Sequence, residues 1–448
     1  MGSAKDSTQH KDTGKRPLEF KSLVPLHHKT EVPQIITTSK AIFTITNSRR
    51  QLLIFMVVLF LAANYLDLFK HPTDSLISNI RMMILVINLV VVYLAVVFLP
   101  EPSKKRGFAL FWKIVQGCAM AYSLNILVWL FFTKENLQYI LKNVYDSNLG
   151  QPLGEKSYAE DCRVYTPENP KSYFANITGS FDIFVLAHFL GWTFKVWIFR
   201  NSAMAWVMSV GFEIMEWTME VWLPNFKECW WDHFLFDLFG CNLIGMLIGQ
   251  YTIRKFNMRK LFWFVERTEE YEALPWYKKF VYAFTSRDEH VKTGKWHWLS
   301  ELWTFNAVIW FWFMNMYIDL SYFYNKAMIE IPPPHWLCAV RIWILAFFCI
   351  IAANDYYDYI VTRKCHNMTL PIFLLHFIMI VEGLLFLKNI KSSLFDNPLH
   401  YHIKVFWIGF FVIMAAVQLY LLGERVYKNR KLKSSQVNSQ PAKPIKAH

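Results

Sequence analysis

Ionisable and amide side chains recur in a stretch of this chain that is otherwise apolar. The apolar runs between residues 181 and 252 contain one histidine, several carboxylates and one asparagine, namely His188, Glu213, Glu216, Asp237 and Asn242. Charged groups are costly inside a bilayer and occur there mainly where they carry function. Glu213, Glu216 and Glu220 are spaced i, i+3 and i+7, which places them on one helix face. Asp237 and Asn242, five residues apart, are predicted to align less well.

The carboxylates favour a divalent cation site. Carboxylates that meet in a low-dielectric setting repel one another, and a bound cation allows them to stay ionised. Carboxylate and amide oxygens suit hard cations, so we predict Ca²⁺ or Mg²⁺ rather than zinc. The alternative is that some carboxylates are protonated or paired with Lys195 or Arg200. The predicted metal ligands are Glu213, Glu216, Glu228, Asp232, Asp237 and Asn242.

His188 is the predicted catalytic residue. A lone histidine on an apolar helix is more often a packed structural residue, but here it falls at the same membrane depth as the carboxylates. Its imidazole could accept a proton from a hydroxyl group while the cation binds a phosphate. Substrate binding is predicted for four further residues, although the tryptophans equally suit a membrane interface. These four are Asn225, Lys195, Trp230 and Trp231.

The composition is that of a polytopic membrane protein. The 448 residues are 54% hydrophobic and only 18% charged, and apolar runs of about 20 residues recur along the chain. We therefore predict an all-α fold, an integral membrane helical bundle with about ten transmembrane helices. The net charge of +13 is concentrated in loops and tails, where it suits membrane topology and anionic lipid, so we expect no nucleic-acid partner. The sequence leaves open whether two copies form a homodimer.

Clusters of Lys and Arg orient the predicted spans. All of these clusters fall on one side if the spans alternate, so both termini are predicted to be cytosolic. Residues 1–40 are predicted to be a disordered cytosolic tail, 41–423 a single transmembrane catalytic bundle and 424–448 a basic cytosolic tail. The spans are approximately 50–69, 80–100, 108–132, 181–199, 203–223, 233–251, 297–318, 335–353, 370–388 and 404–422.

This topology places the polar residues in the lumenal half of three consecutive helices. At a rise of ~1.5 Å per residue, His188 and Glu216 lie ~10 Å below the lumenal surface, Asp237 ~6 Å and Asn242 ~14 Å. Their similar depths make a common site plausible.

The lumenal loops carry two further signals. The tripeptide Asn176-Ile177-Thr178 is a glycosylation sequon, which is usable only on the lumenal side. Cys162 and Cys229 also fall on that side, where oxidation is permitted. A disulfide between them and two free thiols are both compatible with the sequence.

Four strings in this stretch resemble the base-exchange phosphatidylserine synthases. The longest, LPNFKECWWD over residues 223–232, is too unusual to match by chance. The close resemblance covers residues 181–252, and outside it the similarity is mainly in the order of spans and loops. The other three strings are HFLGWTFK (188–195), FEIME (212–216) and DLFGCN (237–242).

The resemblance implies a Ca²⁺-dependent enzyme of the endoplasmic reticulum membrane, with its active site facing the lumen. Such an enzyme replaces the headgroup of phosphatidylcholine or phosphatidylethanolamine with L-serine and needs no nucleotide-activated donor. The resemblance also implies that His188 is the catalytic histidine and that the six predicted metal ligands form the acidic and amide shell. Leu243 departs from the family pattern, which has glycine there, and the C-terminal half shows no visible match.

Two other functions fit parts of the pattern. Membrane-bound O-acyltransferases combine many spans with an intramembrane histidine, but they need no carboxylates beside it. A cation transporter would line a path across the membrane with acidic groups. Here the acidic groups thin out after Asn242, leaving Lys195 and Arg200 towards the cytosolic side.

Overall fold

The chain folds into helices. The computed structural model describes residues 57, 61, 76–99, 109–151, 153, 159–168, 172–181, 183–223, 226–264, 273–275, 277–278, 301–361, 368–390 and 397–438. Helices and connecting segments account for these residues, with no strand among them, which confirms the all-α prediction. The predicted tail 1–40 and, apart from Val57 and Leu61, the predicted span 50–69 lie outside the described residues.

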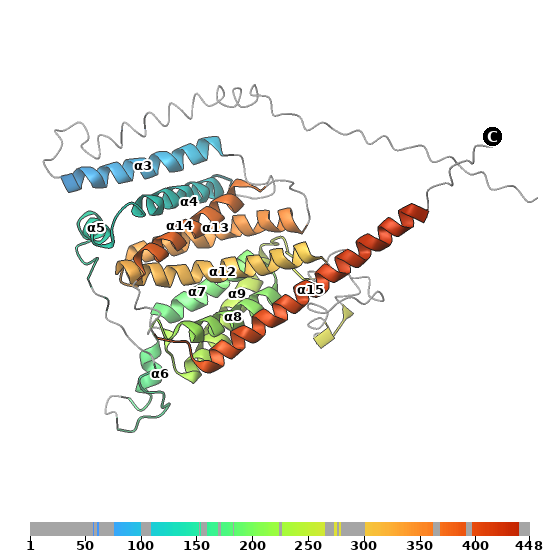
Figure 1. Ribbon diagram of the computed structural model, residues 1–448. Helices are drawn as coiled ribbons and strands as arrows, with labels where there is room; N and C mark the ends of the chain where they lie inside the picture. The colour runs from blue at the N-terminus through green and yellow to red at the C-terminus, as the bar shows by residue number, and fades with distance from the viewer. Residues whose placement is uncertain are drawn as a thin grey trace, which may run out of the picture. The chain divides into compact units, whose positions relative to one another are not determined.

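The other nine predicted spans each coincide with a described helix. Several helices run beyond the predicted ends, and the last continues through part of the segment 424–448. Short helices α5 (Lys134–Ile140), η1 (Leu141–Tyr145) and α6 (Ala175–Ser180) lie between the long ones. The long helices in Figure 1 are α3 (Leu76–Phe98), α4 (Ala109–Trp129), α7 (Ile183–Phe199), α8 (Ser202–Met219), η3 (Asp232–Asn242) continuing into α9 (Leu243–Lys255), α12 (Leu302–Ile329), α13 (Trp336–Ile360), α14 (Leu370–Asn389) and α15 (Tyr401–Asn438).

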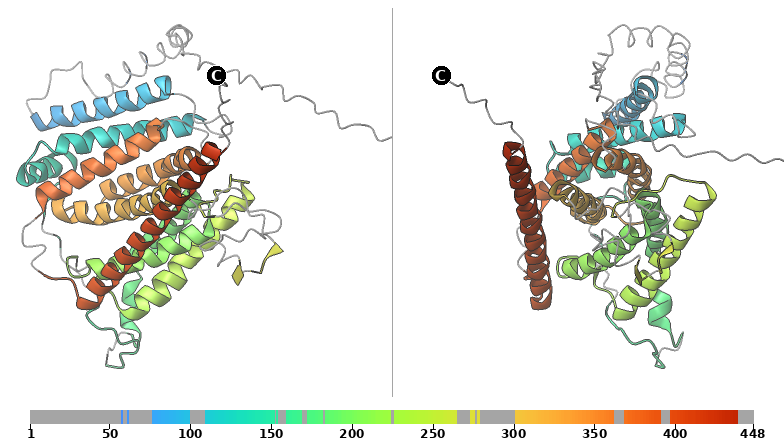
Figure 2. Two further views of the ribbon diagram at one scale, coloured as in Figure 1. Left: turned by 45° about the vertical axis from the view of Figure 1, so that its right-hand side comes forward. Right: turned by 90° about the vertical axis from the view of Figure 1, so that its right-hand side faces the viewer.

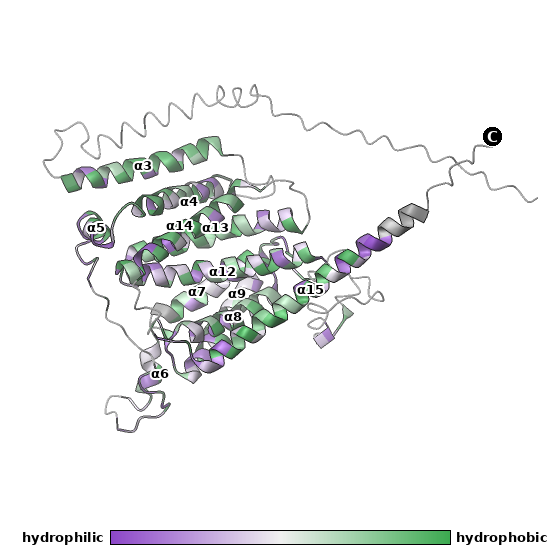
Figure 3. Ribbon diagram, in the orientation of Figure 1, coloured by the Kyte–Doolittle hydropathy of each residue, from purple (hydrophilic) through white to green (hydrophobic). Residues whose placement is uncertain are grey.

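Five of these helices are long and apolar enough to cross a membrane: α3, η3 with α9, α13, α14, and α15 as far as Lys431. Helix α7 has only 17 residues, and α8 contains the buried carboxylates Glu213 and Glu216. Figure 3 shows that α3 is mostly apolar and that the middle of α15 is apolar, with a polar stretch further along α15. Since few residues of either helix are buried in the described part of the chain, these two helices have the surface expected beside lipid.

Close packing of α7 against α9 fixes the helix that carries His188 (Figures 1 and 2). Gly245 and Gly249 are four residues apart on α9, a spacing that lets two helix backbones approach closely. A Cβ atom added to Gly245 would lie only 2.5 Å from the Phe189 carbonyl oxygen. The Thr193 hydroxyl donates a hydrogen bond across this contact to the Gly245 carbonyl, at 3.1 Å. The backbone beside His188 is therefore held directly against α9.

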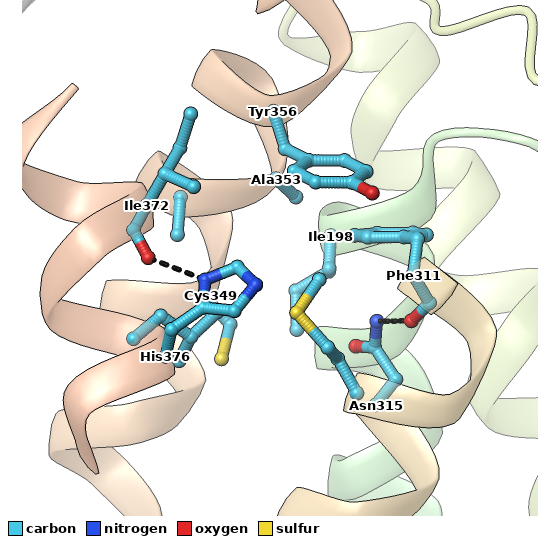
Figure 4. A pocket seen from close by; sticks show the side chains of 11 residues that line it. Ile198, Phe311, Asn315, Cys349, Ala353, Tyr356, Ile372 and His376 are labelled. Carbon is cyan, nitrogen blue, oxygen red and sulfur yellow. Dashed lines mark hydrogen bonds between the residues drawn. The ribbon is translucent and has the colours of Figure 1, made fainter. Parts of the chain in front are cut away.

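The centre of the bundle is closely filled. Trp263 stacks on Phe311 with ring centroids 4.2 Å apart. The cavity among α7, α12, α13 and α14 in Figure 4 measures about 10 Å³, which is room for a single water molecule. His376 faces this cavity, with Nδ1 2.7 Å from the Ile372 carbonyl and with Trp310 Nε1 donating to its Nε2 at 2.9 Å. Because both ring nitrogens have a partner, His376 is a structural histidine.

Candidate active site

Side chains predicted to carry out chemistry come together from three neighbouring elements. Helix α7 supplies His188, α8 supplies Glu213 and Glu216, and η3 supplies the remaining charged and amide groups. Glu228 lies in the short segment that leads into η3. Most of these side chains are removed from solvent, with Glu216 1% exposed and Asn242 fully buried.

The helix type of η3 decides how its polar side chains line up. In an α-helix of 3.6 residues per turn, groups five residues apart diverge. Asp232–Asn242 is instead a π-helix, in which hydrogen bonds run from i to i+5 and the turn is wider. Asp232, Asp237 and Asn242 are each five residues apart, so they lie close to one face. The predicted poor alignment was wrong because it assumed α-helical geometry.

Asn242 and His233 hold the carboxylates of α8. The Asn242 amide Nδ2 donates to Glu213 Oε1 at 3.0 Å and to the Ser209 hydroxyl at 3.1 Å. His233 Nδ1 lies 3.1 Å from Glu213 Oε2 and 3.8 Å from Glu216 Oε2. These contacts tie η3 to α8 and place two carboxylates beside one imidazole.

His188 meets Asp237 across the interface of α7 and η3. His188 Nδ1 and Asp237 Oδ1 are 3.1 Å apart, although their alignment is outside that of a hydrogen bond. Such contacts in catalytic sites are often loosely aligned before substrate binds. A carboxylate at Nδ1 favours the tautomer that carries its proton there, which leaves Nε2 free to accept a proton.

A disulfide fixes the segment that carries Glu228. Cys162 and Cys229 are bonded, with Cα atoms 5.3 Å apart, so the disulfide is confirmed over two free thiols. Glu228 Oε2 consequently lies 3.7 Å from His233 Nδ1. Burial and the neighbouring Asp237 carboxylate raise the pKa of Glu228 to about 9.

The cluster has the ligands and the unsatisfied atoms of a cation site. Three of its oxygens are buried and have no hydrogen-bond partner among the described residues: Glu216 Oε2, Glu228 Oε2 and Asn242 Oδ1. A buried oxygen without a partner is costly, and a hard cation would satisfy several at once. Two overlapping groups have ligand atoms within 4.8 Å of one another, Glu213 with Glu216 and His233, and Glu228 with His233 and Asp237.

The basic residues of α7 make contacts elsewhere. Lys195 forms an ion pair with Asp319 on α12, so its charge is compensated by a carboxylate that is not part of the cluster. Arg200 donates to Asn354 Oδ1 at 3.1 Å. Lys195 therefore balances Asp319 and not the cluster, and a substrate contact by Lys195 stays a prediction.

The other predicted substrate-binding residues have different surroundings. Trp230 is 61% exposed, as an interfacial anchor would be. Trp231 is buried, and its indole Nε1 donates to the Cys162 carbonyl at 3.1 Å. Asn225 lies outside the described residues.

Sequence reasoning missed His233, which stands between the two groups of carboxylates. Its Nε2 is buried and lacks a hydrogen-bond partner in the described part of the chain. The sequence did contain a signal for His233. It precedes Asp237 by four residues, and residues at that spacing face the same side of a helix.

Comparison with known proteins decides the family. The family described as Phosphatidyl serine synthase matches residues 108–390. The chain belongs to the phosphatidylserine synthase family. It is accordingly a transferase that forms phosphatidylserine, and neither an O-acyltransferase nor a cation transporter is needed to explain its histidine and carboxylates. The match also continues to residue 390, beyond the residues 181–252 in which the resemblance is visible.

Individual relatives agree with this assignment. A rice protein named CDP-diacylglycerol–serine O-phosphatidyltransferase 2 is 31% identical over 322 residues, covering 71% of this chain and 75% of the relative. An Arabidopsis thaliana protein named CDP-diacylglycerol–serine O-phosphatidyltransferase 1 is 32% identical, covering 70% and 73%. Human Phosphatidylserine synthase 2 is 30% identical, covering 72% and 66%. The similarity thus spans most of the chain.

Proposed function

We propose that this phosphatidylserine synthase works by base exchange, replacing the choline or ethanolamine headgroup of a phospholipid with L-serine. The observation that carries the proposal is the meeting of His188 and Asp237 beside the buried carboxylates of α8 and η3. Exchange converts one phosphodiester into another, so the reaction needs a base and a stabilised phosphate but no activated donor.

His188 is the proposed catalytic base. The serine hydroxyl is a poor nucleophile until a base removes its proton. With Asp237 at Nδ1, the Nε2 atom of His188 can take that proton while the serine oxygen bonds to phosphorus, and can return it to the departing alcohol. In a second route Nε2 attacks phosphorus directly and breaks the bond to the headgroup oxygen. The serine oxygen then displaces Nε2 from phosphorus, and the serine proton goes to the released headgroup alkoxide.

Ca²⁺ is the proposed cofactor. The donors are those that Ca²⁺ prefers, carboxylate and amide oxygens, and the three unpartnered buried oxygens fit its need for several ligands. When bound, the cation would neutralise charge on the phosphodiester. The residues proposed to hold it are Glu213, Glu216, Glu228, Asp232, Asp237 and Asn242, with His233 as an additional neighbour.

We further propose a multi-pass protein of the endoplasmic reticulum membrane with about ten spans, cytosolic termini and a lumenal active site. The Cys162–Cys229 disulfide supports this orientation, because such bonds persist in oxidising compartments. Glycosylation of Asn176, measured by a mobility shift that a glycosidase removes, tests the orientation. Association into a homodimer stays a prediction.

The names of the plant relatives indicate a second candidate for the phosphatidyl donor, which can be tested directly. Their names state that they transfer the phosphatidyl group from CDP-diacylglycerol to serine. The same base and cation site could serve that donor, since serine attacks phosphorus in both reactions. The two reactions differ in the leaving group, which is CMP in one and choline or ethanolamine in the other.

The released leaving group discriminates these donors. Purified protein receives labelled serine and Ca²⁺ with phosphatidylcholine, phosphatidylethanolamine or CDP-diacylglycerol, and both labelled lipid and released alcohol or CMP are measured. Base exchange predicts one choline or ethanolamine per phosphatidylserine formed, and no product with His188→Ala. Product from CDP-diacylglycerol alone would overturn base exchange while leaving phosphatidylserine synthesis intact.

A further inference from the structure

A second cavity lies apart from the acidic cluster. It measures about 650 Å³ and lies among α3, α4, η1, α12, α13 and α14, whereas the cluster belongs to α7, α8 and η3. No residue is shared between the two sites. The volume is within the range of sites that hold a small molecule or part of a lipid.

Apolar side chains form most of the wall and continue onto the outer surface. Ile126 and Ile329 are buried within it, while Leu85 and Leu89 on α3 and Trp336 at the start of α13 are about half exposed. In a membrane-length helix such as α3, an exposed apolar surface faces lipid. A ligand would therefore enter from the bilayer.

Among the described residues that line the cavity, the one carboxylate, Glu382, is already engaged. Glu382 Oε2 accepts from Arg341 Nη2 at 2.8 Å and Oε1 accepts from Arg341 Nε at 3.0 Å. The hydroxyls of Tyr122 and Ser321 also donate to this carboxylate. The pair is neutral and saturated with donors, so Glu382 has little capacity to bind a cationic ligand group.

Among the described residues of the wall, Arg81 and Lys326 carry the two other positive charges. Arg81 is exposed on α3, and Lys326 is only 5% exposed on α12. The Lys326 ammonium lies 5.5 Å from the Tyr322 ring centroid and 5.3 Å from that of Phe323, which offsets only part of the cost of its burial. The described residues of the cavity wall thus carry a formal charge of +2.

Asn325 supplies the second observation that points to a ligand. Its Oδ1 and Nδ2 are both buried, and neither has a hydrogen-bond partner in the part of the chain that the structure describes. A side-chain amide in this state is costly unless a ligand or water fills its bonding capacity. It adjoins Lys326 in the sequence, and both line the cavity.

We propose that this cavity binds one anionic phospholipid, with its phosphodiester near Lys326 and Asn325 and its glycerol and upper acyl segments along the apolar wall. Among the described lining residues, the ammonium of a choline or ethanolamine headgroup would meet one carboxylate, Glu382, whose oxygens already accept hydrogen bonds. An anionic headgroup instead matches the two cations. The inference does not rest on base exchange, because it concerns binding at a site that contains none of the reacting residues.

Binding is tested on the full-length protein in detergent, without serine or Ca²⁺. A photoactivatable phosphatidylglycerol serves as the probe, and crosslinked peptides are mapped by mass spectrometry. Competitors are unlabelled phosphatidylglycerol, phosphatidylcholine and inorganic phosphate. We expect labelling of α3 or α12 peptides, competition by phosphatidylglycerol at a concentration about tenfold lower than by phosphatidylcholine, and none by phosphate.

Variants distinguish an effect of the Lys326 charge from a general loss of folded structure. Lys326→Met should weaken binding about tenfold or more, Lys326→Arg should retain it, and the matched control Lys428→Met, on the exposed part of α15, should bind as wild type. Asp237→Asn should also bind normally. Equal labelling of the Lys326→Met and wild-type proteins, competition by phosphate alone, or loss of labelling in Asp237→Asn would each overturn the proposal.

Discussion

Substitution of Gly245 by alanine tests how precisely α9 positions His188. The added Cβ would lie 2.5 Å from the Phe189 carbonyl oxygen, whereas ordinary contact begins near 3.4 Å. Helix α7 must therefore move by about 0.9 Å at the residue next to His188. A displacement of about 1 Å at a reacting group can lower the rate about 10²-fold. We expect a decrease of that order in kcat for serine incorporation.

Gly191→Ala is the matched control, because it adds the same methyl group to α7 where no atom lies within 4 Å. Serine incorporation is measured for both variants, and the melting temperature and Ca²⁺ binding confirm that each is folded. Since α8 and η3 carry nearly all of the proposed cation ligands, Gly245→Ala should bind Ca²⁺ within about threefold of wild type. Wild-type kcat in Gly245→Ala, or an equal loss in Gly191→Ala, would refute this account of positioning.

Three further changes probe the acidic cluster. Glu216→Gln should weaken Ca²⁺ binding about tenfold or more in calorimetry, and unchanged affinity would remove Glu216 from the ligands. Glu228 has a pKa of about 9, so Ca²⁺ must displace its proton at neutral pH. The affinity for Ca²⁺ should therefore rise as the pH approaches that value. In Glu228→Gln this pH-dependent rise in Ca²⁺ affinity should be smaller. Because this folded-state pKa is raised, the cation-free protein should also lose stability as pH rises from the carboxyl's unfolded value towards about 9, which melting curves would show. Cys162→Ser removes the disulfide that fixes the segment beside Glu228. It should raise the Ca²⁺ concentration needed for half-maximal activity. A Ca²⁺ titration that superimposes on that of the wild type would contradict this prediction.

Hydrophobicity and charge placement determined much of the fold from the sequence alone. Apolar runs predicted the positions of the nine long helices among the described residues, with η3 and α9 counted as one. A long apolar segment removed from water satisfies its backbone groups by forming a helix. The string LPNFKECWWD and the carboxylates around it also identified the family and most of the cluster. Helix ends were less certain, as at α15, because polar residues such as those after 423 can continue a helix once it has begun.

Only the tertiary structure decided how the polar groups face one another. The sequence did not reveal that Asp232–Asn242 would be a π-helix, since side-chain periodicity was judged for 3.6 residues per turn. It also gave no partner for His233, whose position follows from the packing of η3 on α8 and from the disulfide at Cys229. The pairing of Lys195 with Asp319 joins residues 124 positions apart, a contact that local patterns cannot encode. The residue types determined which chemistry is possible, and long-range packing determined which side chains lie close enough to carry it out together.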